Sequence, residues 1–229
     1  MKKIISLLVV ALMGTTATFA QSAAELAKQK QELNKLHMKM LNAKPSKDAK
    51  KQAKEWKKDG WQVPAGEIAM EKQITKSQLF AEELMTDEDG GITQRYLQNT
   101  GQQTAGTYNA AYAAARSAAL TELASLIETK LASAWKQNVD NAQNSAVSSI
   151  TNDKFHERSM AIVNQSITNA IPVLAIYRVL PNNNYQVQVR LAFDKKEIAA
   201  RLKRNLQKEL EMEGDMIDGM VEDIICKEM

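Results

Sequence analysis

Arg116 interrupts an alanine-rich stretch at residues 107–131. At about 100° per residue, the apolar side chains of this stretch fall on one half of a helix, and Arg116 falls inside that half. A guanidinium is not buried alone, so it must reach water along its methylene groups or meet a carboxylate or backbone carbonyls. We therefore expect Arg116 to form a structural tie. The alternative is a site in which Arg116 binds the carboxylate or phosphate of a small ligand or substrate.

A lysine-rich segment at residues 47–58 supplies a second candidate surface, since it has little apolar surface of its own. The residues expected on this surface are Lys50, Lys51, Lys54, Trp56, Lys57 and Lys58. Such a helix is either solvated or held by a partner, and its charge suits an acidic segment of the same molecule or of a neighbour. A further alternative is that residues 28–58 bind the surface of an anionic membrane.

The acidic turn TDEDGG at residues 86–91 invites comparison with a calcium-binding loop. Asp87 and Asp89 would fall on ligand positions of an EF-hand. However, the first ligand position would be Met85 and the bidentate glutamate position would be Tyr96, so two essential oxygen ligands are missing. The pattern therefore favours an acidic turn over a calcium site.

The other polar residues indicate no metal, cofactor or catalytic site. His37 and His156 lie far apart, with no second ligand at zinc spacing. The sequence lacks the G-x-S-x-G, H-E-x-x-H and P-loop patterns. Two carboxylates can still meet in space, but the acids cluster in surface-like helices and in the tail. We expect a protein that is not an enzyme.

Residues 1–20 have the pattern of a cleavable export signal. Lys2 and Lys3 precede an apolar run that is shorter than the roughly 20 residues that span a bilayer. Thr18-Phe19-Ala20 has small residues at the positions that signal peptidase requires. We therefore expect the mature chain in the periplasm or cell envelope. No cysteine lies near the cleavage point, so we expect no lipid attachment.

Cysteine and charge add two constraints. Cys226 is the only cysteine, so an internal disulfide is excluded, and the thiol lies either in a half-buried or disordered tail or in an intermolecular disulfide. The net charge of +3 falls by two when the signal peptide is removed. The charge of the mature chain therefore gives no reason to expect nucleic-acid binding. Residues 21–60 are basic, with eleven lysines against five acids, whereas residues 66–90 and 205–229 are acidic.

The elements that carry these residues are mainly helical in the N-terminal part of the chain. Helical spacing predicts helices at 22–43, 46–58 and 65–85. Residues 92–99 have the composition of a strand, and residues 140–152 that of a loop or a poor strand. Apolar residues at helical spacing follow in a composition that also suits a strand: Met160, Val163, Ile167 and Ile171.

The clearest prediction is a long helix on a hairpin. Residues 105–138 form the strongest helix of the chain, with one apolar half. PVLAIYRVL at 172–180 and YQVQVRLAF at 185–193 flank the turn Pro181-Asn182-Asn183-Asn184. One side of the second strand is apolar: Tyr185, Val187, Val189, Leu191 and Phe193. We expect the long helix to rest on this side.

The C-terminal part begins with a varied capping box, formed by Asp194 and Glu197. The helix that it starts has an apolar stripe: Ile198, Leu202, Leu206 and Leu210. The last segment, residues 214–229, is a short acidic amphipathic tail. It either packs on the domain or offers its apolar side to a partner groove.

The order of these features resembles the LPP-twenty lipoprotein family of bacterial envelope proteins, whose domain is similar to the N-terminal part of a flagellar assembly protein. The similar features are a strand ending in Gly101, the Ala-Arg-x-x-Ala motif at Ala115, Arg116 and Ala119, and the asparagine-turn hairpin. They cover roughly residues 92–194. The resemblance implies a helix laid across an antiparallel sheet, an adaptor or structural role, and a packing role for Arg116. It carries over no catalytic residue.

Together these patterns predict an α+β fold, with a long alanine-rich helix packed on a small antiparallel sheet, N-terminal lysine-rich helices and a C-terminal helix. The expected segments are a signal peptide at 1–20, a lysine-rich helical arm at 21–60, a helix and acidic turn at 61–91, an LPP-twenty-like domain at 92–213 and an acidic tail at 214–229. We expect an exported adaptor, structural or binding protein whose partner is an envelope protein or a cell-wall component.

Overall fold

The computed structural model describes residues 31, 35, 44–86, 90–141, 147–210 and 214–229. The chain divides into two compact units, Met1–Lys44 and Pro45–Met229. The second unit holds the fold described below and is α+β, as the sequence predicts. The expected signal peptide and the expected helix at 22–43 lie largely outside the described residues.

A three-stranded antiparallel sheet organises the second unit. Its strands are β3 (Tyr96–Ala105), β4 (Ile171–Val179) and β5 (Tyr185–Asp194), and β5 lies in the middle. The predicted hairpin of β4 and β5 is confirmed, with Val179 opposite Tyr185 at its closed end. The turn contains Asn183 with a φ of 61°, a left-handed conformation that asparagine adopts more readily than most residues.

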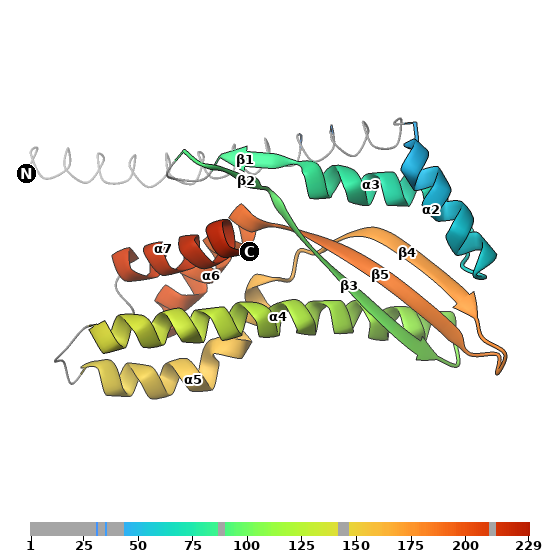
Figure 1. Ribbon diagram of the computed structural model, residues 1–229. Helices are drawn as coiled ribbons and strands as arrows, with labels where there is room; N and C mark the ends of the chain where they lie inside the picture. Colours follow the sequence, from blue (N-terminus) through green and yellow to red (C-terminus); the bar gives the residue numbers. More distant parts are fainter. Residues whose placement is uncertain (1–30, 32–34, 36–43, 87–89, 142–146, 211–213) are drawn as a thin grey trace, which may run out of the picture. The chain divides into compact units, whose positions relative to one another are not determined.

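Helix α4 (Tyr108–Asn141) lies along one face of this sheet (Figure 1). Its small residues Ala111, Ala115 and Ala119 are buried against the strands, and larger residues follow as the helix continues. The apolar side of β5 faces it, as predicted, through Val187, Val189, Leu191 and Phe193. Leu126, which helical spacing also places in the apolar half, has an exposed side chain instead.

The opposite face of the sheet is covered by α2 (Lys47–Lys58) and α3 (Met70–Glu82), which belong to a second apolar cluster. Its buried members are Ala49, Ala53, Trp61, Met70, Ile74, Leu174 and Ile176. The extended residue Gln62 forms an isolated antiparallel bridge with Tyr177 of β4. The chain therefore builds helices on both faces of one sheet.

Three departures from the expected elements have local causes. Helix α3 begins at Met70 and not at residue 65, since Pro64 and Gly66, with a φ of 89°, precede it in a turn. A small hairpin of β1 (Leu84–Thr86) and β2 (Ile92–Gln94) follows α3. The described residues of the region 140–152 are helical, because α4 runs to Asn141 and α5 (Val147–Ser166) begins at residue 147.

The C-terminal elements close the larger cluster on the α4 side. Helix α6 (Lys195–Leu210) buries Ile198, Leu202 and Leu206. Its cap is half of the predicted box, since the backbone N–H of Glu197 donates to Asp194 at 3.3 Å while the Glu197 carboxylate accepts from Arg201. The Leu210 side chain lies outside the described residues.

The tail packs on the domain as α7 (Gly214–Glu222) and the π-helical turn η1 (Asp223–Glu228). Its buried apolar residues are Ile217, Met220, Val221, Ile224, Ile225 and Cys226. Burial, together with the neighbouring Glu222, raises the pKa of the Cys226 thiol to about 12. Of the two alternatives expected for the tail, packing on the domain is therefore the correct one.

The boundaries between segments also differ from the expected ones. Residues 47–58 were expected in a separate arm, but α2 belongs to the unit that begins at Pro45, because Ala49 and Ala53 are buried with residues of β4. The tail and residues 61–86 belong to the same unit. The expected arm is thus divided between two units.

Candidate anion-binding site on helix α2

Helix α2 presents its lysines outward because its small residues face the domain. Ser46 caps its N-terminus by accepting a hydrogen bond from the backbone N–H of Ala49 at 3.0 Å. Ala49 and Ala53 lie four residues apart on the same side of the helix, and both are buried. The remaining positions leave lysine side chains in water, which is where their ammonium groups are best solvated.

Four of these lysines line one hollow of about 440 Å³ between α2 and the first turn of α3. The lining residues are Lys50, Ala53, Lys54, Lys57, Lys58 and Glu71. Lys57 is held at 3.1 Å from the Glu71 carboxylate, and both groups are partly exposed. The residues that line the hollow therefore carry four positive charges and one negative charge.

Glu71 is the residue of this site that sequence reasoning missed. Its own backbone N–H in the first turn of α3 lowers the pKa of its carboxyl, burial opposes this effect, and Lys57 and Lys50 lower the pKa further. Glu71 thus stays ionised and neutralises part of the lysine charge. Charge counting along the chain placed Glu71 in a separate acidic block, so no local signal linked it to α2.

Two members of the expected lysine surface lie elsewhere. Lys51 is exposed on α2 but is not part of the lining of the hollow. Trp56 is half-buried and packs against the apolar cluster under α2, so it anchors the helix and does not contribute an exposed aromatic surface. The structure brings together Lys50, Lys54, Lys57 and Lys58.

Arg116 lies on the flank of the buried alanine stripe of α4, between the half-buried residues Tyr112 and Leu120. It has intermediate exposure, and no ion pair or hydrogen bond joins its guanidinium to a residue of the described part of the chain. This agrees with the interpretation in which the methylenes cover apolar surface and the charged group reaches water. The expected tie to a carboxylate is not seen among these residues.

A different arginine, Arg190, lies partly buried between α3 and the sheet. Arg190 of β5 donates to the hydroxyl of Thr100 at 2.9 Å and to that of Ser77 at 3.0 Å. Burial lowers the pKa of its guanidinium. Ser77 in turn donates to the side chain of Gln98 at 2.8 Å, so the network ties α3 to β3 and β5. Alternation along β5 predicts only that Arg190 lies on its polar side.

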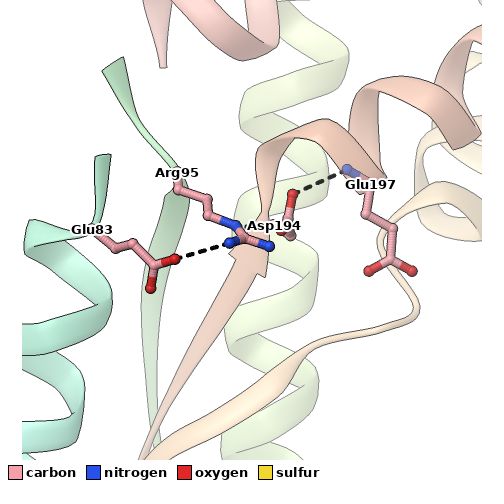
Figure 2. Close-up of polar contacts among 4 residues, drawn as sticks. All are labelled: Glu83, Arg95, Asp194 and Glu197. Carbon is pink, nitrogen blue, oxygen red and sulfur yellow. Dashed lines mark hydrogen bonds and ion pairs between the residues drawn. The ribbon is translucent and has the colours of Figure 1, made fainter. Parts of the chain in front are cut away.

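Arg95, between β2 and β3, joins two parts of the fold (Figure 2). Its guanidinium lies 2.9 Å from Glu83 at the end of α3 and 2.9 Å from Asp194 at the start of α6. Asp194 also caps α6 through Glu197. All three ion-pair members are mostly shielded from water, so Arg95 neutralises two carboxylates that would otherwise repel each other.

We predict that Arg95→Met lowers the free energy of unfolding by about 2 kcal/mol, since it leaves two shielded carboxylates without their cation. Urea denaturation followed by far-ultraviolet circular dichroism measures the loss. Arg158→Met is the matched control, because it removes an exposed ion pair to Glu209, and we expect a loss below about 0.5 kcal/mol. Equal losses in the two variants would contradict a stabilising role specific to Arg95.

The other expected or excluded sites are only partly covered by the structure. Residues 87–89 of the acidic turn, His37 and the side chain of His156 lie outside what the structure describes. Within its described part, the chain has no group of three or more His, Cys, Asp or Glu side chains placed to hold a metal ion. No helix of that part is long and apolar enough to cross a bilayer.

Comparison with known proteins gives no family for this chain: no family model, curated protein or solved structure matches it. The resemblance to the LPP-twenty family therefore stays a prediction from the residues at 92–194. The lysine-lined hollow is the feature of the described structure with the most definite binding chemistry.

Proposed function

We propose that this chain is an exported, non-enzymatic protein of the cell envelope that acts as an adaptor by binding an anionic partner in the hollow of α2. The observation that carries the proposal is the convergence of Lys50, Lys54, Lys57 and Lys58 on one concave surface. Four lysines along one hollow attract phosphate or carboxylate groups, and a hollow binds a partner of complementary shape better than it binds free counter-ions.

The way α2 is held supports a binding role. Ala49, Ala53 and Trp56 pack the helix onto the domain, and Ser46 also donates to Gln78 of α3 at 3.2 Å. The lysines therefore project from a fixed backbone and not from a mobile arm. A fixed set of charges loses less conformational entropy on binding than a flexible one.

Export to the periplasm or envelope rests on the signal pattern of residues 1–20. The adaptor or structural class is what the resemblance to envelope lipoproteins implies. Partners with matching chemistry are an acidic surface of an envelope protein or an anionic cell-wall component. The alternative is that residues 28–58 contact an anionic membrane. In that case lysines on both sides of α2 contribute to the membrane binding.

A charge-matched pair of variants tests the proposal. The hollow variant carries Lys50, Lys54, Lys57 and Lys58 changed to Gln, and the control variant carries Lys47, Lys51, Lys136 and Lys196 changed to Gln. The control lysines are exposed and are not part of the lining of the hollow. Both variants lose the same charge, so net charge alone affects them equally.

We expect the tagged wild-type protein to capture an anionic component from its own envelope, with retention that falls as salt rises. The hollow variant should retain at least about tenfold less, because four exposed ion pairs at roughly 0.35 kcal/mol each amount to about 1.4 kcal/mol, whereas the control should stay within about twofold. Equal loss in the two variants would reject the hollow as the binding site.

Vesicles separate the membrane alternative from the adaptor role. The wild-type and both variant proteins are mixed with vesicles of phosphatidylcholine alone and with added phosphatidylglycerol. The adaptor proposal predicts at most weak binding that both variants reduce equally, because diffuse charge carries it. Strong binding to the anionic vesicles, without capture of another envelope component, would replace the adaptor role by a membrane-surface role.

A further inference from the structure

The two edges of the three-stranded sheet are protected to different degrees. An edge strand exposes a row of unpaired backbone N–H and C=O groups, and natural proteins block such edges with proline, bulges, charged side chains or a covering segment. β4 and β3 are the two edges here, because β5 lies between them. β4 is protected along more of its length than β3.

The β4 edge is blocked along most of its length. Pro172 lacks an N–H, and a register shift interrupts the ladder between Pro172 and Leu174. Lys76 of α3 donates to the carbonyl of Pro172 at 2.9 Å. Further along, Gln62 covers Tyr177 through two backbone hydrogen bonds, of 2.7 and 2.9 Å. A further strand cannot pair with β4 without displacing these groups.

The β3 edge has one local block and is otherwise open among the described residues. The backbone N–H of Thr100 donates to the side chain of Asn99 at 2.9 Å, and the Asn99 amide donates to Ala119 of α4 at 2.8 Å. Thr100 therefore directs its N–H away from β5. In an antiparallel ladder the same outward direction recurs at every second residue, which includes Gln102 and Thr104.

The open part of β3 is also exposed on both faces. Gln102, Gln103 and Thr104 are all exposed, although their side chains alternate between the faces of the sheet. This end of the strand therefore projects past the helices that cover the rest of the sheet. In the described part of the chain, β5 is the one strand that pairs with β3.

Charge determines which partner suits this edge. The chain is 25% charged, yet no Asp, Glu, Lys or Arg occurs between Arg95 and Arg116. The first turns of α4, from Tyr108 to Ala115, carry no charged side chain either. A second copy of this surface meets no like charge when it approaches, whereas like charges placed opposite each other would oppose pairing.

We propose that β3 pairs with β3 of a second copy of this chain, antiparallel and about a two-fold axis at Gln103, so that two three-stranded sheets become one six-stranded sheet. In this register Gln102 faces Thr104 of the other copy. Both residues direct their backbone N–H and C=O groups outward, so the two pairs exchange about four hydrogen bonds. A two-fold axis makes the surface complementary to itself, and no second binding surface is needed.

The register ends where the structure already blocks the edge. Pairing beyond Gln102 reaches Thr100, whose N–H is bound to Asn99, and pairing beyond Thr104 reaches the turn at Gly106. The strand contact is therefore short. Because the surface buried by so short a contact is well below that of a stable dimer, we expect monomer and dimer to exchange.

The two-fold axis makes a cross-linking experiment specific. Gln103 faces Gln103 of the other copy as a non-hydrogen-bonded pair, where Cα atoms lie about 4.5 Å apart, within the range of a disulfide. Gln103→Cys should form a covalent dimer on mild oxidation. Gln102→Cys and Thr104→Cys place the thiol one position away, and each then faces a non-cysteine residue. The native Cys226 is buried, so it does not compete.

Sedimentation of the full-length mature chain gives a second measurement. The wild-type protein should show a reversible, concentration-dependent dimer, and Gln102→Pro should abolish it. Proline removes an N–H that points away from β5, so the ladder with β5 is retained, which an unchanged circular dichroism spectrum checks.

Strong cross-linking of Gln103→Cys alone, with a dimer that Gln102→Pro removes, supports the proposal. Equal cross-linking of the three cysteine variants, or a wild-type protein that sediments as a monomer up to its solubility limit, overturns it. Cross-linking of Gln103→Cys to a different envelope protein also overturns it, and assigns the edge to a strand of that protein.

Discussion

Gly101→Val is expected to destabilise the protein by at least about 3 kcal/mol, because β3 and α4 approach each other at this residue with no room for a side chain. A Cβ atom at Gly101 would overlap the carbonyl oxygen of Ala115 and lie 2.7 Å from the backbone nitrogen of Ala119. Both atoms belong to the backbone of α4, so no rotation of a flexible side chain relieves the overlap. The helix would have to move away from the sheet.

Urea denaturation measures this loss, and Gly106→Val provides the matched control. Gly106 lies just beyond the same strand, is exposed and has no heavy atom close to the position of an added Cβ. The control makes the same chemical change without the overlap, so we expect a loss below about 1 kcal/mol. If the two variants lose equal stability, the close approach of α4 to β3 is not what the protein depends on.

Val221→Asp in the C-terminal tail should lower the free energy of unfolding by about 4 kcal/mol or more. The Val221 side chain is 0% exposed and belongs to the cluster that α4 and β5 share with the tail. An aspartate there is either buried as an unpaired charge or forced to detach α7 from the domain.

Gly219→Asp adds the same charge to the same helix at an exposed position, and we expect it to cost less than about 1 kcal/mol. Alkylation of Cys226 at pH 8 reports detachment of the tail. In the wild-type protein the thiol is buried with a pKa of about 12, so the reactive thiolate is scarce, and we expect little modification. Rapid alkylation in Val221→Asp but not in Gly219→Asp is the expected pattern. Equal rates would show that the tail is not held by Val221.

The secondary structure of the core is predictable because its signals are local. Alternation in YQVQVRLAF identifies the apolar side of β5, and three-to-four-residue spacing identifies the buried side of α4. Asparagines between two apolar runs identify the turn. Each of these patterns extends over a few consecutive residues, so the sequence alone is enough to recognise it.

Predictions were weaker where composition and packing disagreed. The polar residues near 140–152 read as a loop, yet the described residues of this region are helical at both ends, because α5 packs between α4 and α6. The lysine-rich α2 read as part of an arm, yet two alanines join it to the domain. Tertiary packing overrides weak local preference in both places.

For the candidate site, the sequence determined which residues are cationic and that the five expected lysines recur along one helix, since charge and spacing are properties of the chain itself. The structure alone decided that Glu71 completes the hollow, that Trp56 is an anchor and that Arg116 lies on a flank with no carboxylate partner among the described residues. These facts depend on how distant segments meet. Contacts such as Gly101 with Ala115, or Arg95 with Glu83 and Asp194, form only once the helices and the sheet have packed, and no periodicity along the chain encodes them.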